Sequence, residues 1–183
     1  MKIQLATTAD LPAFFTYLND HLSDNGKGGT NLFQPLSRDE SCLNDGMKGR
    51  FSDGISQTLS PTTAQTGWRR LWIALDGQNN IIGHIDIRAH PENHTQHRTL
   101  LGMGVDRNVR KQGLGTKLLS AMVDWVKKNT TIEYIDLCVL SENDPARQLY
   151  LRFGFEQYGE IKDMFRIEGK SSSYSLMSYK IVQ

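Results

Sequence analysis

Hydrophobic and polar residues recur along the chain with two different periods, which separate predicted strands from predicted helices. The opening run "KIQLA" predicts a short strand. Apolar residues then recur at helical spacing around Pro12, which suits a first helical turn. This repeat predicts one buried helix face, made of Leu11, Phe14, Phe15, Leu18 and Leu22.

The stretch from Ser23 to Gly67 is polar and rich in Gly, Ser, Thr and Asn. Within it, "SRDE" has the S-x-x-E form of a capping box and predicts a helix that starts near Ser37. A connection this long in a small domain is typically either functional or disordered, and the pattern leaves both interpretations open.

A hairpin and a third strand follow this polar stretch. "RLWIALD" and "IIGHIDIRA" are two β-rich runs separated by the turn "GQNN", and "TLLGMGVD" extends the same sheet. A helix with an apolar side comes next, and its repeat suits burial against a sheet. That side is formed by Leu114, Leu118, Leu119, Met122, Trp125 and Val126.

The C-terminal third predicts one buried strand, one helix and two antiparallel strands. "YIDLCVL" is nearly continuous in apolar residues, as in a strand buried on both faces. Pro145 suits a first helical turn and Gly154 a helix end, while "MFRIEG" and "SYSLMSYKIV" alternate like strands. The order β, α, α, three strands, α, β, α, two strands predicts one mixed α/β domain over residues 1–183, with a central strand–helix–strand crossover.

Composition narrows the class of protein. The chain has 183 residues, a formal net charge of +1 and 22% charged residues, which favours neither a nucleic-acid nor an acidic-membrane partner. Cys42 and Cys138 lack the spacing of a CxxC pair, so we expect free thiols and no metal site. The N-terminal segment lacks a continuous apolar core and no later run approaches about 18 apolar residues, so we expect a cytoplasmic protein. The sequence leaves open whether the protein forms a homodimer.

The turn "RKQGLGT" places two glycines and two cations directly before the apolar helix that starts near Leu114. The first N–H groups of a helix have no helical partners and attract phosphate oxygens, and glycine lets a ligand approach the main chain. A polyanion is therefore one natural partner, and a tight turn with solvated cations is the other interpretation. The P-loop pattern is absent, and Leu118 replaces the third glycine of the dinucleotide fingerprint.

"RKQGLG" resembles the [RQ]-x-x-G-x-[GA] turn of the GNAT superfamily of acyl-CoA-dependent N-acetyltransferases. "NDPARQLYLRFGF" is similar to that family's second signature, N-x-x-A-x-x-L-Y ending in G-F. The resemblance covers roughly residues 100–155. It implies a GNAT fold: a mixed, mostly antiparallel sheet with helices on both faces and a splayed central strand pair. It also implies that acetyl-CoA is the co-substrate and that a primary amine attacks it directly.

The resemblance also implies the residues of the cofactor site. The turn would bind the pyrophosphate through backbone N–H groups, with side-chain help from Arg110 and Lys111. Met103 and Val105 would pair through their main chains with the pantetheine arm, Asn143 would contact the cofactor, and Tyr150 would protonate the departing thiolate. The turn itself comprises Arg110, Lys111, Gln112, Gly113, Leu114, Gly115 and Thr116.

One departure from the family leaves the general base open. Many relatives have a glutamate on the strand before the turn, whereas "HRTLLGMG" contains no carboxylate. His97, His84, Asp86 and water remain as alternatives, although the alternation of His84 and Asp86 also fits a solvent-facing side. A coenzyme A-binding module without turnover is the alternative function.

The acceptor is a small-molecule amine or a protein amino group, and the sequence does not choose between them. Trp68, Phe33 and Phe51 are candidate walls of its site, whereas we expect Trp72 in the core. We expect the segment from Ser23 to Gly67 and the hairpin to set acceptor specificity, because the second half of the chain binds the cofactor.

Overall fold

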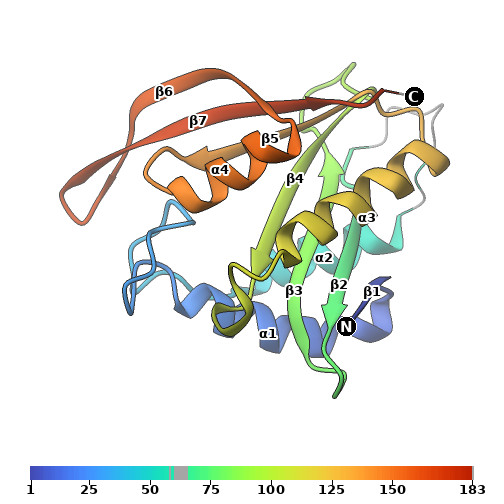
Figure 1. Ribbon diagram of the computed structural model, residues 1–183, viewed down its shortest axis with the longest axis horizontal. Helices are drawn as coiled ribbons and strands as arrows, with labels where there is room; N and C mark the ends of the chain where they lie inside the picture. Colours follow the sequence, from blue (N-terminus) through green and yellow to red (C-terminus); the bar gives the residue numbers. More distant parts are fainter. Residues whose placement is uncertain (58, 60–65, 183) are drawn as a thin grey trace.

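The computed structural model describes residues 1–57, 59 and 66–182. These residues form one seven-stranded sheet and four α-helices (Figure 1). The elements in chain order are β1 (Lys2–Leu5), the 3₁₀ turn η1 (Thr8–Asp10), α1 (Leu11–Ser23), α2 (Asp45–Ser56), β2 (Arg69–Leu75), β3 (Ile81–Ala89), β4 (Arg98–Val105), the 3₁₀ turn η2 (Arg107–Val109), α3 (Leu114–Asn129), β5 (Tyr134–Leu140), α4 (Asp144–Phe153), β6 (Glu156–Ile167) and β7 (Lys170–Lys180).

The strand order is β1-β2-β3-β4-β5-β7-β6, and every neighbouring pair is antiparallel except β4 and β5. The parallel pair is joined by α3, as the predicted crossover requires. Its pairing starts at Arg98 with Tyr134 and ends at Leu100 with Asp136, although both strands continue. Beyond that point the strands diverge, and in Figure 1 β7 and β5 run across the direction of β2–β4. The predicted fold, including the splayed central pair, is confirmed.

Helices cover both faces of the sheet, and the alternation of β2 decides which residues meet which helix. Trp72 and Ala74 belong to the apolar cluster that includes the buried face of α3. Leu71 and Ile73 belong to the opposite cluster, which includes the buried face of α1 and Phe51 of α2. Trp72 therefore lies in the core, as expected.

The helix expected near Ser37 does not form. The hydroxyl of Ser37 donates to Oε2 of Glu40 at 2.6 Å, so the capping contact exists, but it closes only a turn. The next residues, "SCLN", have no helical apolar repeat, and the Asn25 side-chain amide binds the Ser41 hydroxyl at 2.8 Å. The helix instead begins at Asp45, where the Asn44 side chain accepts a hydrogen bond from the Met47 N–H.

Two expectations about the C-terminal strands were wrong in detail. β6 begins at Glu156, well before the predicted "MFRIEG", because an edge strand can keep polar side chains on both sides. Cys138 of β5 is exposed, so this strand is not buried on both faces as predicted. On the side of the sheet that carries Cys138, α1 contacts β3 and α2 contacts β2, so neither helix covers β5. Both cysteines are free.

Candidate active site

The open edge of β4 is the first part of the site. The Asp106 N–H donates to the Ile82 carbonyl at 3.0 Å, so the facing residues Val105 and Gly83 form a non-hydrogen-bonded pair. The main-chain groups of Val105, and of Met103 two residues earlier, therefore point away from β3. These N–H and carbonyl groups point toward β5, which no longer pairs with β4 at these positions. An extended chain could pair with this edge as a peptide adds to a sheet.

The glycine turn continues directly from this edge into α3. Gly113 is the N-cap of α3 with φ of +79°, and no described atom lies within 4 Å of where its Cβ would be. The hydrogen bond from Lys117 N–H to Gly113 carbonyl is the first of the helix, so the N–H groups of Leu114, Gly115 and Thr116 have no helical acceptor. This bare, positively polarised helix end fits a phosphate group.

Some side chains of the glycine turn are held by hydrogen bonds, and others are exposed. The Arg110 guanidinium donates to the Val105 carbonyl at 3.1 Å and to the Thr30 hydroxyl at 3.2 Å, so it lies toward β4 and the α1–α2 loop. Gln112 donates to the Asn108 carbonyl at 3.3 Å, while Lys111 is exposed and has φ of +61°. Leu114 is buried in the core, which leaves only its backbone for a ligand.

The helix α4 lies against the same end of α3. A Cβ at Gly115 would lie 2.7 Å from Cδ2 of Leu149 and 3.7 Å from Cε of Met103, so α3, α4 and β4 meet there. Asn143 is the N-cap of α4 and accepts from the Ala146 N–H. Tyr150 is buried with its ring 5.4 Å from Phe155, and burial raises the pKa of its phenol.

On the opposite face, β3 side chains lie over glycines of β4. A Cβ at Gly102 would lie 2.7 Å from Oδ1 of Asp86 and 3.3 Å from Nη1 of Arg88. A Cβ at Gly104 would lie 2.6 Å from Cε1 of His84. The glycines of "GMG" therefore make room for a carboxylate, a guanidinium and an imidazole supplied by the neighbouring strand.

Asp86 and His84 are buried, so their interpretation as a solvent-facing pair is wrong. Asp86 forms ion pairs with Arg69 at 3.1 Å and Arg88 at 3.4 Å. These two residues do share one side of β3, but α1 and α2 cover them there, whereas Arg88 and Cys138 on the same side of the sheet stay partly exposed. Sequence reasoning also missed Arg88, although its alternation with His84 and Asp86 placed it on the same side.

A cluster from α1 packs on this face near Gly104. The Tyr17 hydroxyl donates to the Gly104 carbonyl at 3.3 Å and lies 3.3 Å from Nδ1 of His84. The His21 ring stacks on Tyr17 with 5.9 Å between centroids. Burial, then His84 and Arg110, lower the pKa of His21 to about 3, and burial and Arg69 lower the pKa of His84 to about 3. Both imidazoles are neutral near pH 7, and neither favours accepting a proton.

His97 is an exposed residue before the first residue of β4. At about 3.3 Å per residue, it lies about 17 Å along the strand from Gly102. His97 is therefore remote from the open edge of β4, whereas Asp86 lies over Gly102 beside that edge.

The candidate aromatic walls separate onto two faces. Trp68 packs with the α3 side of the core, and Phe51 packs with the α1 side, where the Arg69 guanidinium lies 3.9 Å from its ring centroid. Phe33 is half-buried beside His21, with 4.8 Å between ring centroids.

The α1–α2 loop, residues 24–44, holds Phe33 and reaches toward the second half of the sheet. Asn25 is fully buried and organises it, since its side chain binds five groups of the loop. Arg38 reaches Glu168 in the β6–β7 turn, and Asn31 donates to the Glu142 carbonyl. Thr58 and residues 60–65 of the predicted specificity segment lie outside the described residues.

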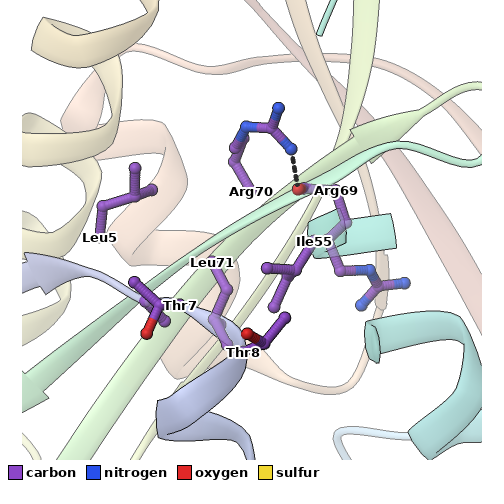
Figure 2. Close-up of a pocket in the computed structure, with 8 residues that line it drawn as sticks. Leu5, Thr7, Thr8, Ile55, Arg69, Arg70 and Leu71 are labelled. Atoms are coloured by element: carbon purple, nitrogen blue, oxygen red, sulfur yellow. Dashed lines mark hydrogen bonds between the residues drawn. The ribbon is translucent and has the colours of Figure 1, made fainter. Parts of the chain in front are cut away.

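A separate cavity of about 360 Å³ lies beside the edge of β2, where β1 has ended (Figure 2). It is lined by Leu5, Ala6, Thr7, Thr8, Ile55, Arg69, Arg70 and Leu71. The Arg70 guanidinium is engaged with the Arg69 carbonyl at 2.6 Å. Arg69 lines this cavity, and its guanidinium pairs with Asp86 of β3.

The described residues contain no group of three or more His, Cys, Asp and Glu side chains able to hold a metal ion. None of the helices in the described part of the chain has the length and apolar character needed to cross a membrane.

Comparison with known proteins agrees with this geometry. The model of the acetyltransferase (GNAT) family matches residues 44–155, which include the open edge, the glycine turn and α4. The chain belongs to the GNAT acetyltransferase family. This GNAT protein is also 26% identical over 116 residues to L-amino acid N-acetyltransferase AaaT of Escherichia coli (strain K12). That match covers 63% of this chain and 64% of the relative, so it spans just under two thirds of the relative's length.

Solved structures show the same fold. An acetyltransferase of the GNAT family from Streptococcus pneumoniae superposes with a TM-score of 0.78 at 22% identity, covering 98% of this chain and 99% of that one. The yncA protein from Salmonella typhimurium, solved with its cofactor acetyl-CoA, gives a TM-score of 0.75 at 16% identity. It covers 100% of this chain and 95% of that chain.

Proposed function

We propose that this GNAT protein transfers an acetyl group from acetyl-CoA to a primary amine by direct attack, with both substrates bound together. One observation carries the proposal: a bare helix end continues into the main-chain edge that β5 has left open. An anionic group at Gly113 and an extended amide arm along Met103 and Val105 would fit this continuous surface. When bound, acetyl-CoA supplies an acetyl thioester activated for attack by nitrogen.

Residues of the chain would bind and orient acetyl-CoA. The N–H groups of the turn bind the pyrophosphate, and the Val105 N–H donates to an amide of the arm. Tyr17 supports that contact, because the Gly104 carbonyl that it binds belongs to the same peptide unit as the Val105 N–H. Asn143 at the start of α4 contacts the cofactor from the other side of the gap.

Asp86 is the group suited to receive the amine. Its Oδ1 lies over Gly102 on the face opposite α3, so an approaching ammonium would donate to it. The Asp86 carboxylate already pairs with two guanidiniums, so the proposal uses it as an anchor for the ammonium. We therefore assign proton removal from the ammonium to water. Tyr150 donates a proton to sulfur as the carbon–sulfur bond breaks.

The test of turnover is release of free coenzyme A from acetyl-CoA across a library of amines. We expect release that depends on an amine and yields the N-acetyl product by mass spectrometry. Binding of acetyl-CoA without release for any amine would instead support a coenzyme A-binding module without turnover.

The test of the phosphate site is a matched pair, Gly113→Asp and Gly113→Asn. Both side chains tolerate a positive φ, so the pair differs mainly in charge. At about 5 Å and an effective dielectric constant of about 20, one unit charge repels another by about 3 kcal/mol. We expect acetyl-CoA affinity, measured by calorimetry, to fall roughly 100-fold further in Gly113→Asp than in Gly113→Asn. Equal affinities in the two folded variants would refute the assignment.

A further inference from the structure

The charges over Gly102 do not balance. Asp86 carries one negative charge but pairs with two guanidiniums, those of Arg69 and Arg88. The Asp86 and Arg69 side chains are 5% and 11% exposed, so they form a buried ion pair. Arg88 is 37% exposed and contacts Asp86 at the longer distance of 3.4 Å. One positive charge is therefore left over at this place.

The Asp136 carboxylate of β5 is already engaged by other side chains. Asp136, on β5 at the last paired position, binds Arg98 at 2.6 Å and His90 at 3.1 Å. Among the described residues, Arg88 has no ion-pair partner besides Asp86. The undescribed Thr58 and residues 60–65 contain no acidic side chain.

The surplus charge lies where an acceptor has to bind. Helices α3 and α4 fill the face of the sheet that carries the glycine turn, so an acceptor approaches from the opposite face. There Arg88 borders Gly102, and the exposed Cys138 lies on the β5 side of the gap. Burial raises the pKa of the Cys138 thiol and Arg88 lowers it, so the field of Arg88 reaches across the gap.

We propose that the acceptor is a small α-amino acid, whose carboxylate binds Arg88 while its ammonium binds Asp86. The inference rests on the proposed function and names its substrate class. Nη1 of Arg88 and Oδ1 of Asp86 both lie within van der Waals reach of one absent Cβ, at Gly102, so the two opposite charges are adjacent. An α-amino acid carries its own opposite charges at a similarly short separation. A polyamine would instead place extra positive charge beside the unbalanced guanidinium.

The experiment compares matched acceptors on four proteins. The acceptors are glycine and the L-amino acids that carry a primary α-amine, the primary amides of the same amino acids, and spermidine. The proteins are the wild type, Arg88→Gln, Arg88→Lys, and the control Arg166→Gln, which removes an exposed guanidinium of β6. Coenzyme A release gives kcat/KM, and calorimetry gives the affinity for acetyl-CoA and, in the presence of coenzyme A, for the amino acids.

We expect the wild type and Arg166→Gln to prefer amino acids to their amides. In Arg88→Gln we expect kcat/KM for the amino acid to fall roughly 10- to 100-fold, with the amide and acetyl-CoA affinity nearly unchanged. Arg88→Lys should recover part of the loss. Coenzyme A release with amides or spermidine as good as with amino acids would overturn the substrate class while the proposed function stands.

Absence of release with every amine would contradict the proposed function instead. Calorimetry then tests the proposed amino-acid site independently of turnover. Amino-acid binding that is weaker in Arg88→Gln than in the wild type supports the site. No such binding, or binding equal in the wild type and Arg88→Gln, overturns it.

Discussion

The Tyr150 side chain belongs to the same apolar cluster as the buried face of α3. Its ring is buried against Phe155, while its hydroxyl forms no hydrogen bond with any described residue. Burial raises the pKa of the phenol, so the hydroxyl keeps its proton throughout the working pH range. A phenol that keeps its proton has the protonation state that the proposed acid needs in order to protonate a departing thiolate.

We expect Tyr150→Phe to lower kcat roughly 100-fold, at the smaller end of the range for general acid catalysis. A thiolate is already a fair leaving group, which limits the loss. Acetyl-CoA affinity and the melting temperature should stay close to wild type, because the ring and its packing remain. Wild-type turnover per folded molecule with a lowered melting temperature would show that the hydroxyl is structural.

At the scale of elements, the α1–α2 loop depends on one side chain. Asn25 donates to the Gln34 and Leu36 carbonyls and to the Ser41 hydroxyl, and it accepts from the N–H groups of Phe33 and Gln34. A loop without helix or strand is held in one shape by these contacts. The loop carries Phe33 to His21 and joins the two halves of the sheet through Arg38.

We expect Asn25→Ala to raise the KM for the acceptor roughly 10-fold or more, because the unpaired backbone groups would rearrange the loop. The affinity for acetyl-CoA should change little, since the open edge and the glycine turn belong to other elements. Asn93→Ala, in the exposed β3–β4 connection, is the control. If the acceptor KM did not move in a folded Asn25→Ala protein, the loop would not shape the acceptor site.

For the whole molecule, the buried histidines predict how stability depends on pH. The pKa of His21 and of His84 is about 3 in the folded protein, below the unfolded value near 6.5. The unfolded state therefore binds more protons below pH 6.5, and stability falls with pH from about 6.5 down to about 3. At pH 5 the loss is roughly 2 kcal/mol for each histidine relative to pH 7.5.

Urea unfolding at pH 7.5 and pH 5 measures this loss. We expect His21→Phe, which keeps an aromatic ring beside Tyr17 and Phe33, to lose roughly 2 kcal/mol less than the wild type over the same interval. His94→Phe, at an exposed position, should follow the wild type. Identical pH dependence in His21→Phe and wild type would show that His21 does not stay neutral in the folded protein.

The sequence by itself determined the order of elements and contains the two motifs on which the proposed cofactor site rests. "RKQGLG" and "NDPARQLYLRFGF" are local signals, because a helix end and its glycines act within a few neighbouring residues. The repeat of α3 and the alternation of β2 and β3 are local in the same sense. The capping box at Ser37 marks the limit of such signals, since its contact formed without a helix behind it.

Only the tertiary structure decided where the residues of the proposed acceptor site lie. Alternation placed His84, Asp86 and Arg88 on one side of β3, but it could not tell whether that side meets water or α1. The pairing of β3 with β4 set Asp86 and Arg88 over Gly102, and a shift of one residue would have turned them to the other face. Register between distant strands depends on the packing of the whole sheet, so no short stretch of sequence contains it.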